Sequence, residues 1–206
     1  EPVFRLKQAG EPDQATATLE ALIEEHADDP RLVARLRIEW TRDYRGGIEP
    51  ARKALQTALE MGWDDIASRA FSAIVTRRSM GTVQPGELAR MAERASALAG
   101  TDPELLGHAL DARARLAANQ GRKQEAKRLW TEAVWQHEAC GYRIGVARHL
   151  YRVGLVFQSQ GSLSEASAFY DRAEEVFAET GDVIGASNVL RAMAENAVAF
   201  GHLQEA

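Results

Sequence analysis

The sequence predicts an all-α protein in which antiparallel helix pairs stack side by side as a repeat array. One observation is a spacing of 40 residues between glycines that each open a similar six-residue phrase ending in alanine, at Gly121, Gly161 and Gly201. Another is the spacing of apolar residues between these glycines. Leu150, Val153 and Phe157 recur at the period of one helix face, not with the alternation of a strand.

Start and stop signals along the chain define the individual helices. Ser162 with Glu165 three residues later has the spacing of a capping box, and Pro103 followed by Glu104 is typical of a helix start. Glycines at the ends supply the left-handed turn residue that closes a helix. We therefore expect helices at residues 12–27, 31–45, 48–61, 64–79, 86–99, 103–119, 122–139, 143–160, 163–179 and 183–200, with another starting at 202.

Composition and charge limit the class of protein. The 206 residues are 45% hydrophobic and contain no linker or low-complexity tract, which indicates one array over residues 1–206. The net charge of −5 argues against a nucleic-acid partner, and no apolar run is long enough to span a membrane. The only cysteine, Cys140, favours a reducing, cytoplasmic location. Because the chain lacks an initiator Met, we expect it to be a fragment of a longer protein.

These patterns resemble the tetratricopeptide repeat (TPR) family, in a variant with a 40-residue period. The unit that matches best contains Leu150, Val153, Gly154, Phe157, Gly161, Ala166, Tyr170 and Ala173. Gly or Ala at the crossing of two helices lets their backbones approach closely, and a bulky ring fills the gap to the next pair. The departures are the period, which is usually 34, the missing first signature Trp, and a break near Gly81 and Gly86. The resemblance implies a right-handed α-solenoid.

In that family the first helix of each pair lines a concave groove. Counting back from the turn glycines, the resemblance assigns these positions to a partner-binding groove: Trp40, Phe71, Val75, Arg78, His108, Asp111, Arg115, Asn119, Arg148, Tyr151, Arg152, Leu155, Gln158, Asn188, Arg191 and Glu195. Five of these residues are arginines, whose planar guanidinium groups suit carboxylates. An alternative interpretation is that these arginines are solvated and that their guanidinium groups pair with acidic residues one turn away. Trp130, Tyr170 and Phe157 are expected in the core.

No chemistry-bearing motif stands out. The five histidines show no metal-ligand spacing, and the nucleotide-binding and hydrolase motifs are absent. We therefore expect no enzyme, cofactor or metal site. The function predicted is a scaffold that binds a protein or peptide segment of acidic character, within a bacterial signalling regulator or adaptor. The alternatives are a structural oligomerisation array that associates through its C-terminal end, and the sensor segment of a multidomain ATPase-type transcriptional regulator.

Overall fold

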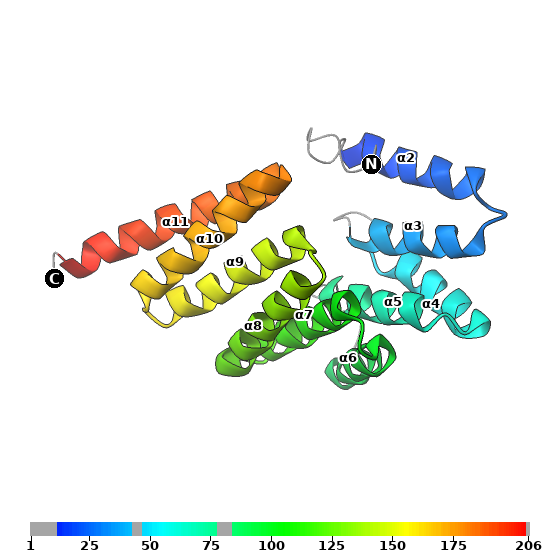
Figure 1. The fold of residues 1–206 in the computed structure, drawn as a ribbon, viewed down its shortest axis with the longest axis horizontal. Coiled ribbons are helices and arrows are strands. Elements are labelled where there is room, and N and C mark those ends of the chain that lie inside the picture. Colours follow the sequence, from blue (N-terminus) through cyan, green and yellow to red (C-terminus); the bar gives the residue numbers. More distant parts are fainter. Residues whose placement is uncertain (1–11, 43–46, 78–83, 205–206) are drawn as a thin grey trace. The chain divides into compact units, whose positions relative to one another are not determined.

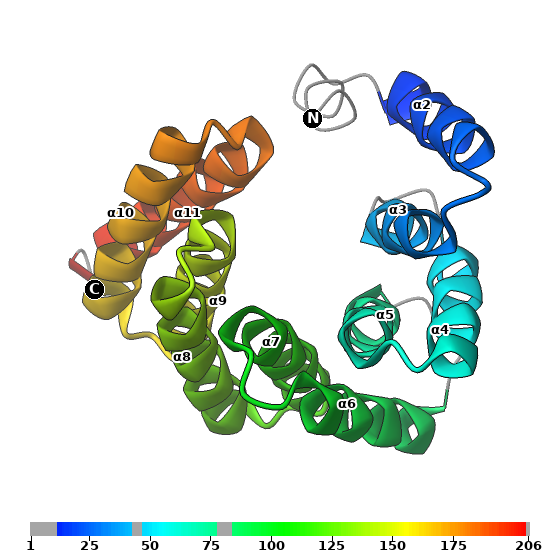
Figure 2. The ribbon, with the colours of Figure 1, turned by 45° about the vertical axis from the view of Figure 1, so that its right-hand side comes forward.

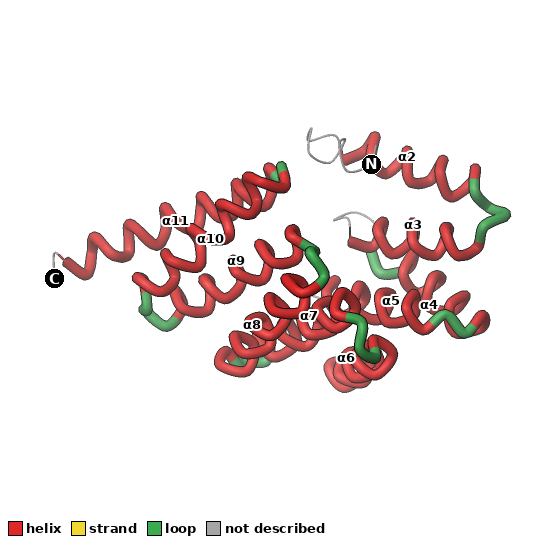
Figure 3. Tube along the Cα trace, viewed as in Figure 1, coloured by secondary structure: helices red, strands yellow, loops and turns green. Residues whose placement is uncertain are grey.

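The computed structural model describes residues 12–42, 47–77 and 84–204, and this part of the chain consists of helices joined by short turns, without a strand (Figure 1, Figure 3). The all-α prediction is confirmed. The helices are α2 (Pro12–Glu25), α3 (Pro30–Arg42), α4 (Glu49–Met61), α5 (Asp64–Arg77), α6 (Pro85–Ala99), α7 (Pro103–Asn119), α8 (Lys123–Ala139), α9 (Arg143–Ser159), α10 (Leu163–Thr180) and α11 (Val183–Gln204). The predicted ends at 43–45 and 78–79 lie outside the described residues.

The helices form two compact units, one ending at Leu116 and the other beginning at Ala117. The first unit contains α2 to α6 and most of α7. Its core is rich in alanine, which brings helix axes close together. Ser68 of α5, fully buried, donates a hydrogen bond to the Ala95 carbonyl of α6 at 2.8 Å, which ties these two helices together.

Four successive turns in the second unit share one geometry. Gly161 has a φ of 78°, which an L side chain rarely adopts, and Ser162 N–H donates to the Phe157 carbonyl at 3.1 Å. Leu163 N–H then donates to the Gly161 carbonyl at 3.0 Å. The same pattern occurs at Gly121, Gly141 and Gly181, so the helix-and-turn unit recurs every 20 residues. The capping box expected at Ser162 is wrong, because its side chain makes no capping bond and this backbone turn starts the helix.

The core of the second unit lies between α8, α9, α10 and α11. Helix α9 contacts all three of the others, and α10 and α11 run side by side (Figure 1, Figure 2). Tyr170 and Phe177 of α10 are fully buried here, and each ring lies against a glycine, Gly154 of α9 and Gly185 of α11 respectively. A Cβ at Gly185 would be 2.3 Å from the Phe177 ring. This confirms that small residues mark the helix crossings.

The structure differs from prediction at Gly201. The sequence pattern predicts a turn there, but α11 continues through Gly201 to Gln204. A glycine inside a helix costs only about 1 kcal/mol.

Candidate functional site

The predicted groove residues of the second unit lie on α9 and α11, two helices in contact with each other. On α9, Tyr151 is half-buried, and its ring centroid is 6.1 Å from that of Tyr170. The Arg152 guanidinium carbon lies 5.8 Å from the Tyr151 ring centroid. Asn188 of α11 is half-buried. The side chains assigned to the groove from sequence therefore include a neighbouring aromatic and cationic pair on one helix.

Tyr170 lies at the base of this α9–α11 surface. Its hydroxyl donates to Gln158 Oε1 at 2.7 Å. Burial raises the pKa of the Tyr170 phenol, and the nearby Tyr151 and Glu195 raise it further. Three predicted groove residues, Tyr151, Gln158 and Glu195, thus surround a side chain that also belongs to the core.

Most arginines of the predicted row are already paired within the chain. Arg148 Nη2 is 3.1 Å from Asp182 Oδ2, and Arg191 Nη1 is 3.1 Å from Glu195 Oε1. Asp182 is buried and also accepts the Gly185 N–H at the start of α11. The surface is therefore less basic than a count of its arginines indicates, as in the alternative interpretation of the row.

Three predicted groove residues of α7, His108, Asp111 and Arg115, are also paired within the chain. Arg115 Nε donates to Asp111 Oδ2 at 2.8 Å on α7, and His108 Nε2 is 3.7 Å from Glu104 Oε1. His108 and the Arg69 guanidinium, which donates to Glu104 at 2.7 Å, hold the pKa of Glu104 well below its usual range.

The remaining predicted positions fall in different environments. Trp40 of α3 is half-buried, and Asn119 is exposed at the end of α7. Arg78 lies outside the described residues. Phe71 and Val75 are wrong as groove-lining residues, since both are buried in the core of the first unit, Phe71 against Ala95 and Ala109.

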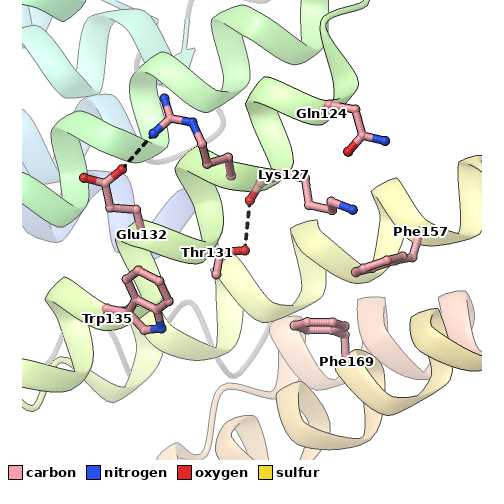
Figure 4. A pocket seen from close by; sticks show the side chains of 8 residues that line it. Gln124, Lys127, Thr131, Glu132, Trp135, Phe157 and Phe169 are labelled. Carbon is pink, nitrogen blue, oxygen red and sulfur yellow. Dashed lines mark hydrogen bonds and ion pairs between the residues drawn. The ribbon is translucent and has the colours of Figure 1, made fainter.

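The expected core aromatics are only partly confirmed. Trp130 and Tyr170 are buried, but Phe157 is half-buried and lines a pocket that sequence reasoning missed. This pocket, of about 510 Å³, is shown in Figure 4 and is lined by Gln124, Lys127, Arg128, Thr131, Glu132, Trp135, Phe157 and Phe169. The sequence signal that could have revealed it is Trp135, because forty residues later the same repeat position holds Glu175, a residue typical of an exposed site. In the structure Glu175 is exposed, and Trp135 is 64% exposed.

A pair of buried histidines was also missed. His137 of α8 and His149 of α9 are 12 residues apart in sequence, and their Nδ1 and Nε2 atoms are 3.0 Å apart. The rings stack at 4.9 Å, and the Tyr142 ring packs edge-on against His137. Across the described ranges, no group of three or more potential metal ligands occurs. Both histidines are buried, so their contact lies inside the core.

Among the described helices, none is long and apolar enough to cross a membrane. No family model matches the sequence, and the search of curated proteins gives no match.

Solved structures do resemble this one. One is a Podospora anserina protein assigned as a kinesin light chain and built of nearly identical TPR-like repeats. The two sequences are 16% identical, the match covers 85% of this chain and 90% of that chain, and the TM-score is 0.58. Another is BtubC from P. vanneervenii, with 14% identity, 95% and 91% covered, and a TM-score of 0.53. At this identity the likeness shows the fold alone, and the fold is a TPR-like helical repeat solenoid.

Proposed function

We propose that this chain is a scaffold that binds a segment of a partner protein on the surface formed by α9 and α11. The observation that carries the proposal is the grouping of Tyr151, Arg148 and Arg152 within about one turn of α9, a helix in contact with α11, which carries Asn188. An aromatic ring with flanking guanidinium groups and an amide provides apolar area together with donors for carboxylates and peptide groups. The partner segment is therefore acidic, or ends in a free carboxylate.

The ion pairs within the chain still allow these arginines to bind a partner carboxylate, but they influence the affinity. Arg148 keeps a side chain that is 51% exposed while it contacts Asp182, and an incoming carboxylate binds the same guanidinium. That carboxylate does not need to displace Asp182, whose burial would make the loss of its cation costly, because a guanidinium has five N–H donors and can bond to two carboxylates. In this proposal the chain has no catalytic role and belongs to one array over residues 1–206 of a longer, cytoplasmic bacterial regulator or adaptor.

The test begins with a random peptide library displayed against the purified chain. Affinities of the selected peptides are then measured by fluorescence anisotropy for wild type and for the double variant Arg148→Ala/Arg152→Ala. We expect a loss of about 1–3 kcal/mol for each charge-assisted contact removed. Arg172→Ala, an exposed arginine of α10, is the control and leaves affinity unchanged. Equal binding by wild type and the double variant refutes the α9–α11 site.

A second candidate function, self-association, is supported by the exposed face of α11. Leu190 is 54% exposed, whereas Leu150, forty residues earlier on α9, is 1% exposed because α10 covers it. Val183, which is seven residues before Leu190 and 58% exposed, lies on the same side of α11. Faces of this kind mark protein contacts.

Light scattering over a range of concentrations tests this second function. Wild type then shows a mass above that of one chain at high concentration, and Leu190→Glu abolishes the increase. Leu59→Glu, at an exposed leucine of α4, is the matched control and leaves the mass unchanged. A one-chain mass at every concentration excludes self-association.

A further inference from the structure

The pocket between α8 and α10 has no role in the function proposed above. Arg148 and Phe157 are nine residues apart on α9, which places them about 180° apart around the helix. Phe157, the pocket residue of α9, therefore lies on the side of this helix opposite Arg148. A ligand in the pocket would leave Arg148 untouched.

Trp135 makes the pocket unusual for a surface depression. It is 64% exposed, while Ala126, Trp130 and Ala133 already supply the buried side of α8. The fold therefore gains little from a tryptophan at position 135. Exposed tryptophan is rare on free surfaces and enriched where proteins bind one another.

The base of the pocket is aromatic and comes from two other helices. Phe157 of α9 and Phe169 of α10 stack with centroids 5.3 Å apart and planes 20° from parallel (Figure 4). Both side chains are only half-buried. Together with Trp135 they form apolar area from three helices that faces the same opening.

Lys127 gives this opening a charge. Its ammonium nitrogen lies 4.2 Å from the centroid of the Phe157 ring, and no carboxylate in the described ranges is within ion-pair distance of it. Arg128 differs, because its Nη1 is 3.4 Å from Glu132 Oε2. Lys127 is thus the pocket cation that remains available to an anionic group of a ligand.

We propose that this pocket binds a helical segment of a partner protein that carries a bulky apolar side chain and a carboxylate within one turn of it. The apolar side chain packs on Phe157, Phe169 and Trp135, and the carboxylate pairs with Lys127. The α8 residues of the lining run from Gln124 to Trp135, about 16 Å along the helix axis, which matches three turns of a bound helix. This inference shares with the proposed function only that the occupant is a protein segment.

The experiment selects 16-residue peptides from a displayed random library on wild-type chain, after depletion on the Trp135→Ala variant. We expect the recovered peptides to combine an aromatic or large aliphatic residue with Asp or Glu three or four positions away. Their affinity, measured by fluorescence anisotropy, falls at least tenfold in Trp135→Ala and in Lys127→Ala. The Lys127→Arg variant, which keeps the positive charge, retains most of the affinity.

Matched variants separate this site from the other surface. Lys123→Ala, which removes an exposed cation of α8 outside the pocket, and Arg148→Ala/Arg152→Ala leave the affinity of these peptides unchanged. Circular dichroism confirms that each variant is folded. If no peptide depends on Trp135, or if the recovered peptides lack acidic residues and ignore Lys127→Ala, the inference is overturned. Peptides captured on Trp135→Ala in the depletion step are tested as well; if they depend on Arg148 and Arg152 and no others are recovered, the proposed function is upheld and this pocket is overturned.

Discussion

Gly154 of α9 faces the ring of Tyr170 so closely that a methyl group at position 154 would be 2.5 Å from Tyr170 Cε1. The Tyr170 ring is fully buried, and its hydroxyl is held by Gln158, so it has little room to retreat. Gly154→Ala therefore forces α9 and α10 apart. We expect a loss of about 1–3 kcal/mol in the free energy of unfolding, measured with urea.

The control for this variant is Gly86→Ala in α6. A Cβ at Gly86 meets nothing within 4 Å, so alanine there restricts only the unfolded chain. We expect a gain of about 0.4–1 kcal/mol. A Gly154→Ala variant as stable as wild type would show that the contact at Tyr170 is looser than described.

The buried pair His137 and His149 has an apolar counterpart one repeat later. Forty residues on, Phe177 and Val189 occupy the same positions and are also buried. Replacing one histidine, as His137→Phe or His149→Val, takes away the partner across the 3.0 Å contact. We expect each single change to cost about 1–3 kcal/mol and the double change to be close to wild type.

A double-mutant cycle in urea measures this coupling. An interaction energy equal in size to the sum of the two single costs is expected, because the double change is close to wild type. If the double variant instead lost the sum of the two single costs, the contact between the two histidines would contribute nothing to the free energy of unfolding.

How much the sequence could predict is clear from the helix crossings. Gly154 and Tyr170 were assigned to a crossing because only a small residue lets the backbone approach a ring, and this requirement leaves a local pattern. The turn at Gly161 follows from the same logic, since its positive φ requires glycine. Features that one helix and its turn determine were therefore mostly predicted, and the exceptions are the capping box at Ser162 and the turn at Gly201.

Contacts between helices distant in sequence could not be predicted. Arg148 pairs with Asp182, 34 residues away, and nothing in the local pattern of α9 marks that partner. Phe71 and Val75 were misplaced because their positions were counted from Gly81, where the repeat is broken. The pocket was missed because Trp135 lies outside the positions that define the repeat.

The carboxylate of Glu104 makes the free energy of unfolding depend on pH. Its pKa is lower when folded than when unfolded, so the unfolded state binds more protons and stability falls as pH drops below about 4.3. At pH 7 we expect Glu104→Gln to be about 1 kcal/mol less stable than wild type, a modest value because the site is partly exposed. The difference narrows as pH falls toward 3, measured by urea unfolding.

The control for Glu104 is Glu20→Gln on α2, where the side chain is exposed. We expect its stability to follow wild type across the same pH range. A Glu104→Gln variant whose difference from wild type stays constant from pH 7 to pH 3 would contradict the link to this carboxylate.

Thr41 of α3 supplies the hydrogen bond that the start of α4 lacks. The first N–H groups of a helix have no partner within it, and Ile48 before α4 offers no capping side chain. Ala51 N–H instead donates to Thr41 Oγ1 at 2.8 Å, and Thr41 is fully buried. Thr41→Val keeps the shape but leaves this N–H unpaired, so we expect a loss of about 1–3 kcal/mol in urea unfolding.

Two further variants show whether the hydroxyl itself is responsible. Thr41→Ser keeps the acceptor and should recover most of the stability. Thr57→Val removes an exposed hydroxyl that bonds only the Lys53 carbonyl, and its effect should stay within about 0.5 kcal/mol. If Thr41→Val and Thr57→Val cost the same, the N–H of Ala51 does not depend on α3, and the start of α4 is satisfied in another way.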